Sequence, residues 1–396
     1  MKILKTTDSL AEFCAKAESA PFIVLDTEFM REKTFYSQLC LIQIATPDDE
    51  AIIDPLADGL DLAPFLSLLD NPDIVKVMHA ARQDIEIFYK LLGHVPPNVF
   101  DTQIAAMALG FGESVGYGNL VKGRLGINLD KGARFTDWSR RPLSENQLKY
   151  ALADVTYLRD LYPGLVDELK DKNRLHWVEE EMADQMRPEL YDFDPERAWA
   201  RLKPRKFSKE YLATLKAAAA WREREAIRRD IPRGRVLKDD GLYVIAQRKP
   251  RTAKELENVR GIPGGFSGRK GITDLLAAIS EAIKTAKTYA PDIRQKKQMP
   301  PDLGPSVDML KTLLRLKTEY EGLAPRLIAN MRDLNALAAF GEKADIKALK
   351  GWRREIFGED ALKMLKGQIG LTIRDKRVVT VENKALEKQV VEKRDE

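Results

Sequence analysis

The positions of strand-like segments constrain the fold of this chain more than any other feature. Four short runs rich in β-branched residues lie near the N-terminus, and turn-forming residues border each run. The first three are joined by short connections that suit an antiparallel meander, and an amphipathic segment before the fourth suits a crossover helix that leads to a parallel strand. The runs are residues 22–29, 39–45, 50–54 and 74–78, and the amphipathic segment is residues 60–69. We therefore expect a mixed sheet flanked by helices.

Helical patterns continue the same domain. Apolar residues recur with a period near 3.6 over residues 82–92, 103–109 and 144–169. Ser144 is placed as the N-cap of the last of these helices. Together with the strands, these segments predict an α/β domain that spans residues 1–190.

The strand-like runs stop near residue 187. A chain of 396 residues is long enough for two or three domains of about 150 residues each. Prolines separate a helical block at residues 207–288, which includes a long helix at residues 211–230, from a second helical block at residues 305–380. We expect two all-α modules after the α/β domain, and a frayed charged tail at residues 383–396.

The two halves of the chain carry opposite net charges. Residues 1–200 hold 21 Lys and Arg against 34 Asp and Glu, a net charge of −13, whereas residues 201–396 hold 44 against 27, a net charge of +17. Lys and Arg that neutralise phosphates drive nucleic-acid affinity, so the basic half suits a polyanion that is presented to carboxylates in the acidic half. A basic but merely solvated helical surface would give the same count, and charge alone leaves both interpretations open.

Composition excludes several classes of protein. The chain is 44% hydrophobic and 32% charged, so it can bury cores, yet no apolar run approaches the roughly 18 residues that a membrane helix requires. The N-terminal segment lacks the apolar stretch and cleavage site of a secretory signal, so we expect a cytoplasmic protein. Cys14 and Cys40 are too few for a disulfide framework or a zinc knuckle, and we expect both to be buried.

Two acids interrupt the first apolar strand. Asp26 and Glu28 are two residues apart, so both side chains point to one face of the sheet. Like charges in a sheet repel one another and lose hydration, a cost that a bound cation would compensate. Oxygen ligands without a cluster of His or Cys favour Mg²⁺ or Mn²⁺ over zinc. The alternative is a strand end in water, and the pair alone does not decide between the two.

Three further residues extend this acidic pattern. Asp84 falls in the first turn of the helix after the fourth strand, where the helix dipole also tolerates an acid. Tyr150 and Asp154 are four residues apart, so they lie on one face of a later helix. Taken singly, Asp84 also suits an acid that stabilises a helix N-terminus, and Tyr150 with Asp154 also suits a surface contact.

The order of these features resembles a known family. An Asp-x-Glu pair on a first strand, an Asp after a later strand and a Tyr-x-x-x-Asp helix occur together in the DEDD exonucleases of the tyrosine subtype, which have a ribonuclease H-like fold. Segments at residues 25–29, 38–43, 101–103 and 136–143 extend the similarity. Over residues 1–190 the combination resembles the ribonuclease D family.

That resemblance implies a set of site residues. Four carboxylates are expected to hold two Mg²⁺ or Mn²⁺ ions, with Asp26 bridging both. By the same resemblance, Glu28 and Asp154 complete the ion that holds the attacking water. Asp84 serves the other ion, and Tyr150 orients the water. The implied activity is 3′-to-5′ hydrolysis of RNA to nucleoside 5′-monophosphates, and the implied substrates are transfer RNA precursors.

The helical blocks add to the resemblance. Residues 207–288 resemble the HRDC domain that follows the nuclease domain in ribonuclease D, through residues 215–224, 236–243 and 258–262. Residues 305–380 resemble a second, more divergent copy. In this family such modules help to hold nucleic acid, which agrees with the net charge of +17 in the second half. Family precedent also implies a monomer without an obligatory protein partner.

Three alternatives stay open at the level of sequence. A DNA-directed 3′-to-5′ exonuclease would use the same acids, because the choice of sugar depends on contacts to the 2′-hydroxyl that the sequence does not display. An RNA-binding protein without nuclease activity would keep the basic modules, although all five expected site residues are present. The arginines at residues 222–229 suit either a solvated helix face or contacts with phosphates.

Overall fold

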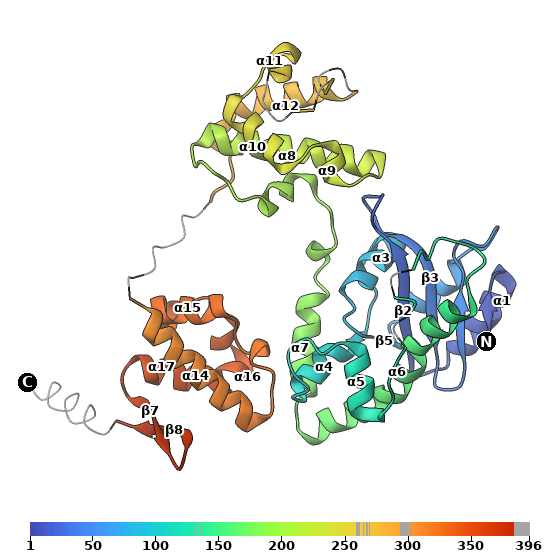
Figure 1. Ribbon diagram of the computed structural model, residues 1–396, viewed down its shortest axis with the longest axis vertical. Coiled ribbons are helices and arrows are strands. Elements are labelled where there is room, and N and C mark those ends of the chain that lie inside the picture. Colours follow the sequence, from blue (N-terminus) through green and yellow to red (C-terminus); the bar gives the residue numbers. More distant parts are fainter. Residues whose placement is uncertain are drawn as a thin grey trace, which may run out of the picture.

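A six-stranded mixed sheet forms the centre of the first domain (Figure 1). The computed structural model of the chain describes residues 1–130, 132–134, 136–258, 262–263, 265–266, 268, 270–293, 300 and 302–383. The strands are β1 (Ile3–Leu4), β2 (Phe22–Met30), β3 (Gln38–Ala45), β4 (Glu50–Ile53), β5 (Val75–Met78) and β6 (Val99–Asp101), and they lie in the order β1-β4-β3-β2-β5-β6.

The strand pairing confirms the expected mixture of meander and crossover. β2 pairs with β3 and β3 pairs with β4, both in antiparallel register, whereas β5 lies parallel to β2 on its other side. The alternation of apolar residues did not reveal β1 and β6, because strands of two and three residues are too short to show a period of two.

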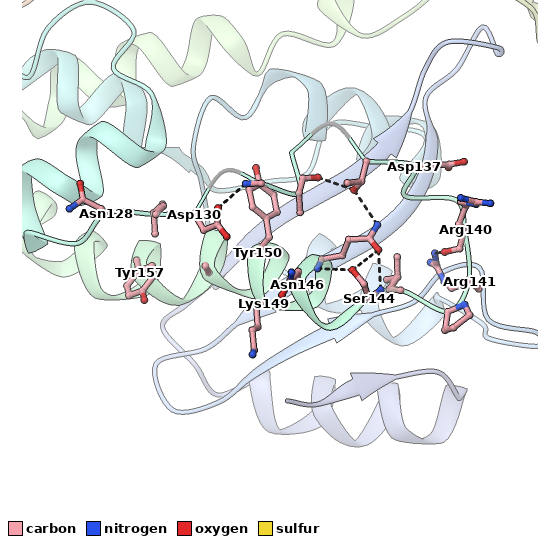
Figure 2. A pocket seen from close by; sticks show the side chains of 18 residues that line it. Asn128, Asp130, Asp137, Arg140, Arg141, Ser144, Asn146, Lys149, Tyr150 and Tyr157 are labelled. Atoms are coloured by element: carbon pink, nitrogen blue, oxygen red, sulfur yellow. Dashed lines mark hydrogen bonds between the residues drawn. The ribbon is translucent and has the colours of Figure 1, made fainter.

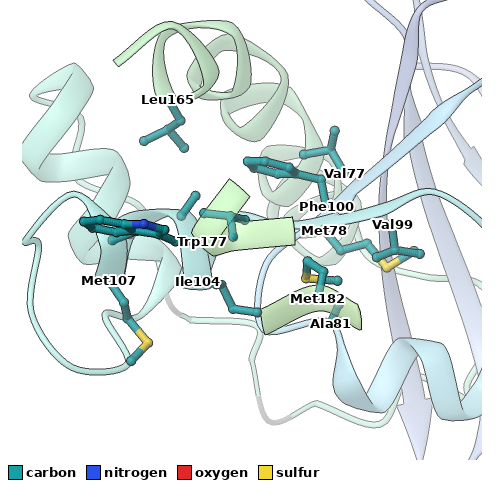
Figure 3. Close-up of a cluster of buried hydrophobic side chains, with 14 of the residues drawn as sticks. Val77, Met78, Ala81, Val99, Phe100, Ile104, Met107, Leu165, Trp177 and Met182 are labelled. Carbon is teal, nitrogen blue, oxygen red and sulfur yellow. The ribbon is translucent and has the colours of Figure 1, made fainter. Parts of the chain in front are cut away.

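Helices cover both faces of this sheet. They are α1 (Thr7–Ala17), α2 (Ala63–Asp70), α3 (Arg82–Leu92), α4 (Thr102–Ala108), α5 (Tyr117–Leu125), α6 (Glu145–Asp171) and α7 (Leu175–Gln185). α6 begins as the sequence predicts, because the Ser144 hydroxyl accepts a hydrogen bond from the backbone of Gln147 in a capping box. Figure 3 shows Trp177 and Met182 of α7 packed near Val77 and Phe100 of the sheet, in one buried apolar cluster.

A first helical module follows a linker. The linker contains short 3₁₀ turns at Pro188–Leu190 and Pro195–Arg201. The module consists of α8 (Lys209–Arg229), α9 (Arg233–Val236), α10 (Asp239–Arg248), α11 (Ala253–Glu257), α12 (Ile272–Lys284) and α13 (Ala286–Tyr289). The long helix predicted at residues 211–230 is therefore confirmed. Residues 259–261, within one segment of the HRDC resemblance, lie outside the described residues.

The basic run of α8 takes part in ion pairs inside the module. Arg222 is buried and donates a hydrogen bond to Asp239. Arg224 pairs with Glu196, and Arg228 pairs with an acid one turn before it in its own helix. These three guanidinium groups are therefore engaged with protein carboxylates rather than forming a purely solvated face.

A C-terminal module contains both helices and a β-hairpin. Its main helices are α14 (Gly304–Glu321), α15 (Met331–Phe340), α16 (Gly351–Arg353) and α17 (Glu359–Leu365), with 3₁₀ turns at Pro325–Leu327, Gly341–Lys343 and Lys347–Leu349 and a π turn at Arg354–Gly358. An antiparallel hairpin of β7 (Ile369–Arg374) and β8 (Arg377–Glu382) follows. The expectation of a second all-α block is therefore wrong. Residues 384–396 of the expected charged tail lie outside the described residues.

Both modules contact the α/β domain. In the C-terminal module the ring of Trp352 stacks on that of Trp177 from α7, with centroids 4.2 Å apart. In the first module, helical residues enclose Phe35 from the turn between β2 and β3. None of the helices in the described part of the chain combines the length and the apolar character that a membrane crossing requires. Cys14 and Cys40 are both buried, as expected.

Candidate active site

One strand and one helix bring three carboxylates together. Asp26 and Glu28 lie on β2, so their side chains emerge on one face of the sheet. α6 packs against this part of the sheet and carries Asp154. Ligand oxygens of Asp26, Glu28 and Asp154 lie within 4.8 Å of one another. The chain thus gathers acids that are more than 120 positions apart in its sequence.

Asp84 approaches the same cluster from the first turn of α3. Its carboxylate is buried and accepts a hydrogen bond from the hydroxyl of Thr27, which lies between the two acids of β2. Sequence reasoning did not identify this contact, because a threonine between two acids has no distinctive pattern. Asp84 also lines the same cavity as the other three carboxylates.

These four carboxylates resist ionising together. Burial raises the pKa of Asp26 well above its ordinary value, and the three neighbouring carboxylates raise it further. Burial also raises the pKa of Glu28 to about 8, that of Asp154 to about 7 and that of Asp84 to about 6. A buried donor set made only of carboxylate oxygens suits hard divalent cations, so the cluster fits such an ion.

Tyr150 lies one helical turn before Asp154 and lines the same cavity. Burial raises the pKa of its phenol above the ordinary value near 10, and the Asp154 carboxylate is the next largest cause. The hydroxyl therefore stays protonated at neutral pH. The ring of Trp138 lies 6.1 Å from that of Tyr150; it is buried and lines the wall of the same cavity.

The five predicted residues line one cavity of about 830 Å³, and positively charged side chains line it as well. Arg31, Lys33 and Arg134 line it beside the acids. The positive charge of Arg134 lowers the pKa of both Glu28 and Asp154, although burial outweighs it. Sequence reasoning missed Arg134, because a single arginine in an irregular loop gives no periodic signal.

A second cavity, of about 1180 Å³, adjoins the first (Figure 2). The two share Thr136, Asp137 and Tyr150 as lining residues. Arg140 and Lys149 add positive charge to the second cavity. The two cavities thus place polar and basic side chains on both sides of Tyr150, a composition that suits a phosphate-rich chain.

His79 and Asp101 lie near the site but are held by structural hydrogen bonds. The two ring nitrogens of His79 lie 3.0 Å from the hydroxyl of Thr102 and 3.0 Å from the carbonyl of Val115. The carboxylate of Asp101 accepts hydrogen bonds from three backbone N–H groups, and one of these caps α4. Asp101 is therefore the N-cap of α4.

Gln43 is a buried polar residue to which sequence reasoning assigned no role. It lies on β3 directly opposite Asp26, so the two side chains share one face of the sheet, with Cβ atoms about 5 Å apart. Gln43 is 0% exposed, and neither its Nε2 nor its Oε1 has a hydrogen-bond partner among the described residues. A fully buried amide without partners is rare in folded proteins.

Comparisons with known proteins identify the domains. A model of the 3′-5′ exonuclease family matches residues 1–170, and a model of the HRDC domain matches residues 212–279. The chain is 46% identical over 382 residues to ribonuclease D of Nitrobacter hamburgensis, with 96% of this chain and 100% of that protein covered. It is also 46% identical over 378 residues to ribonuclease D of Granulibacter bethesdensis, with 95% of each protein covered.

A solved structure agrees with these relatives. Escherichia coli RNase D, an exoribonuclease involved in structured RNA processing, superposes with a TM-score of 0.77 at 30% identity, over 92% of this chain and 98% of that chain. The nuclease domain with its mixed sheet and the following HRDC domain are therefore confirmed. The chain belongs to the ribonuclease D family of 3′-to-5′ exoribonucleases, a family of hydrolases.

Proposed function

We propose that this enzyme matures the 3′ ends of transfer RNA precursors, removing trailing nucleotides one at a time as nucleoside 5′-monophosphates. One observation carries the proposal: four carboxylates and a phenol converge on one cavity, namely Asp26, Glu28, Asp84, Asp154 and Tyr150. Ribonuclease D relatives that cover nearly the whole chain support RNA rather than DNA as the substrate. The basic second half supports a grip on the RNA backbone.

Two divalent cations, Mg²⁺ or Mn²⁺, are the cofactors that we propose. We assign Asp26 to both ions, Glu28 and Asp154 to the first, and Asp84 to the second. The all-oxygen donor set and the raised pKa values support this assignment, because cations would relieve the repulsion among the carboxylates. When bound, such ions lower the pKa of a water molecule and stabilise negative charge on phosphate oxygens.

Tyr150 orients the attacking water in this proposal, as in the tyrosine subtype. Its raised pKa makes the phenol a poor base at neutral pH, but its hydroxyl can hold a water by a hydrogen bond. Its position one turn from Asp154 supports this role, because the two side chains then lie on one face of the helix and line one cavity.

The domain organisation that we propose has a nuclease domain at residues 1–190, an HRDC domain at residues 207–288 and a divergent HRDC-like module at residues 305–380. The helices α14–α17 support the last assignment, and the hairpin β7–β8 is an addition to it. We propose a monomer, because both modules pack against the nuclease domain of the same chain. We also propose a cytoplasmic location, where transfer RNA precursors are processed.

Incubation of the purified protein with a 3′-extended transfer RNA precursor and Mg²⁺ tests the function. We expect stepwise shortening from the 3′ end and release of nucleoside 5′-monophosphates, identified by gel electrophoresis and chromatography. A DNA oligonucleotide of matched sequence should be shortened more slowly, and EDTA should stop the reaction. Faster hydrolysis of the DNA would contradict the proposed substrate.

Two variants complete this experiment. Asp26→Ala should abolish hydrolysis while the protein stays folded. Tyr150→Phe should lower turnover about 10- to 100-fold and leave Mn²⁺ affinity nearly unchanged, because it removes a hydroxyl and no carboxylate. Equal inactivity of wild type and Asp26→Ala would favour a protein that only binds RNA, and a collapse of Mn²⁺ affinity in Tyr150→Phe would show that its role is misassigned.

A further inference from the structure

The turn between β2 and β3 links the catalytic cavity to the HRDC domain. Residues 31–37 form this turn and directly follow the strand that carries Asp26 and Glu28. Arg31 and Lys33 of the turn are exposed and line the catalytic cavity. Arg31 also pairs with Glu86 of α3 at 2.8 Å, so the position of the turn and this ion pair together decide where the two positive side chains lie at the edge of that cavity.

Asp230 of the HRDC domain holds the far end of this turn. It ends α8 in the left-handed conformation, with φ of 45° and ψ of 51°. Its Oδ1 accepts two hydrogen bonds, from the backbone N–H of Phe35 at 3.0 Å and from that of Tyr36 at 3.1 Å. Since two consecutive peptide groups donate to one carboxylate oxygen, the path of the turn is fixed at this point.

The Phe35 side chain is packed as part of the HRDC domain. It is 4% exposed and belongs to the apolar core that the helices of the first module form. The guanidinium of Arg233 lies 4.4 Å from the centre of its ring, and two hydrogen bonds of 2.5 Å to Glu223 hold that guanidinium in place. The ring of Phe193 from the linker lies 5.3 Å away. The nuclease domain thus inserts an aromatic anchor into its neighbour.

We propose that Asp230 and Phe35 are positioning residues of the nuclease reaction. Through them the HRDC domain fixes the turn so that Arg31 and Lys33 meet phosphates of the RNA next to its 3′ end. This inference rests on the proposed function and gives the HRDC domain a second task besides holding distant RNA. Even a substrate too short to reach the HRDC helices should depend on the contact.

Asp230→Gly is the variant that tests the contact. Glycine adopts the left-handed conformation at the end of α8 without strain, and it removes the acceptor oxygen. With full-length protein and a five-nucleotide RNA, KM should rise about five- to tenfold and kcat should change less than about twofold, because phosphate contacts at the edge of the site act equally in the ground and transition states. Asp230→Asn keeps an acceptor and tolerates a positive φ, so it should restore a KM close to that of wild type.

Two further variants serve as controls. One tests whether the loss of a negative charge alone raises KM, and the other tests the contact if Asp230→Gly does not fold. Asp240→Ala removes a carboxylate of the same domain, one that forms an exposed ion pair with Arg205 of the linker, so it changes the net charge by the same amount. It should leave KM unchanged, and a rise equal to that of Asp230→Gly would overturn the proposal. Phe35→Leu weakens the contact from the nuclease side and should raise KM in the same direction, which keeps the proposal testable if Asp230→Gly unfolds.

A measurement without RNA distinguishes this inference from the proposed function. Trypsin cleaves after Arg31 and Lys33, so mass spectrometry of a brief digest reports how well the turn is held. Cleavage at these two sites should be faster in Asp230→Gly than in wild type and Asp230→Asn. Unchanged cleavage, or an unchanged KM for the short RNA, would overturn the proposal. A wild type that hydrolyses no RNA would instead refute the proposed function.

Discussion

The acids of the candidate active-site cavity and the acids of α7 have opposite surroundings. In the cavity, burial and neighbouring carboxylates raise pKa values, and that of Glu28 reaches about 8. On α7, the acids Glu180, Glu181 and Asp184 face the C-terminal module, and Lys347 holds the pKa of Asp184 below its ordinary value. Two acidic clusters of one domain thus differ in what neutralises them.

In the α7 cluster, neutralisation comes from the chain itself. Arg353 is 4% exposed and pairs with both Glu180, at 3.1 Å, and Glu181. Lys347 lies 2.5 Å from Asp184. These acids therefore help to join two domains, whereas the carboxylates of the cavity oppose folding until a cation binds. The comparison teaches that a count of acidic residues does not distinguish a candidate metal site, whereas repulsion without a protein cation to relieve it does.

The largest effect on stability is expected at the α7 cluster. Arg353→Ala should lower the free energy of unfolding by about 3 kcal/mol, because it removes a buried guanidinium that pairs with Glu180 and Glu181 and donates a hydrogen bond to the carbonyl of Leu327. Turnover of a five-nucleotide RNA should change less than about twofold at temperatures where the protein is folded, because the cluster lies on α7 and not in the catalytic cavity. Urea denaturation, followed by circular dichroism, measures the first quantity.

Lys350→Ala is the matched control for this change. Lys350 pairs with Asp345 on the exposed surface of the same module, so its loss should leave stability nearly unchanged. If Arg353→Ala were as harmless as Lys350→Ala, the α7 acids would not hold the domains together, and the contrast with the catalytic cavity would be lost.

The carboxylates of the candidate active site should be detectable through the pH dependence of stability. In the metal-free fold Glu28 keeps its proton up to pH about 8, whereas the unfolded chain loses it near pH 4. The folded state binds more protons in this window, so its stability falls as pH rises from about 4 to 8. Glu28→Gln cannot ionise and should be more stable than wild type by about 2 kcal/mol at pH 8 in EDTA, with little difference near pH 5.

Thermal unfolding between pH 5 and 8.5 measures this difference, and Mn²⁺ supplies the control. Saturating Mn²⁺ at pH 8 should stabilise wild type far more than Glu28→Gln, because the variant lacks one carboxylate ligand. If the stability of the two proteins changed in parallel across the whole pH range, positive side chains of the cavity would already neutralise its carboxylates, as Arg353 and Lys347 do for the acids of α7.

The sequence predicted those parts of the fold that have a clear local pattern. β2 and β3 are long enough to show their apolar pattern, and the helix predicted at residues 82–92 agrees with α3 at both ends. The hairpin β7–β8 was missed although its strands are rich in Ile and Val. Asp375 and Lys376 form its turn with φ of 48° and 65°, and this pair lacks the glycine that usually marks such a turn.

The site residues also divide into those that a local motif reveals and those that only packing brings together. The acids and Tyr150 could be predicted, because each occupies a motif within one strand or helix. Arg134 and Gln43 could not, because their proximity to the acids arises only when the loop and β3 pack against β2 and α6. The contact between Asp230 and Phe35 joins residues 195 positions apart, and no local pattern encodes it.

The smallest expected effect concerns Gln43, which lies opposite Asp26 with an amide that has no partner among the described residues. Gln43→Met keeps the length of the side chain and removes the unsatisfied groups, so we expect the metal-free protein to gain about 1 kcal/mol of stability in urea denaturation. Gln103 is the matched control, because its Nε2 donates a hydrogen bond to the carbonyl of Val115 at 3.0 Å. Gln103→Met should destabilise the protein, since it removes this hydrogen bond and leaves the carbonyl of Val115 with the ring of His79 as its single polar side-chain neighbour among the described residues. If Gln43→Met destabilised the protein equally, the amide of Gln43 would have a partner after all, and the catalytic cavity would be as well satisfied as the α7 cluster.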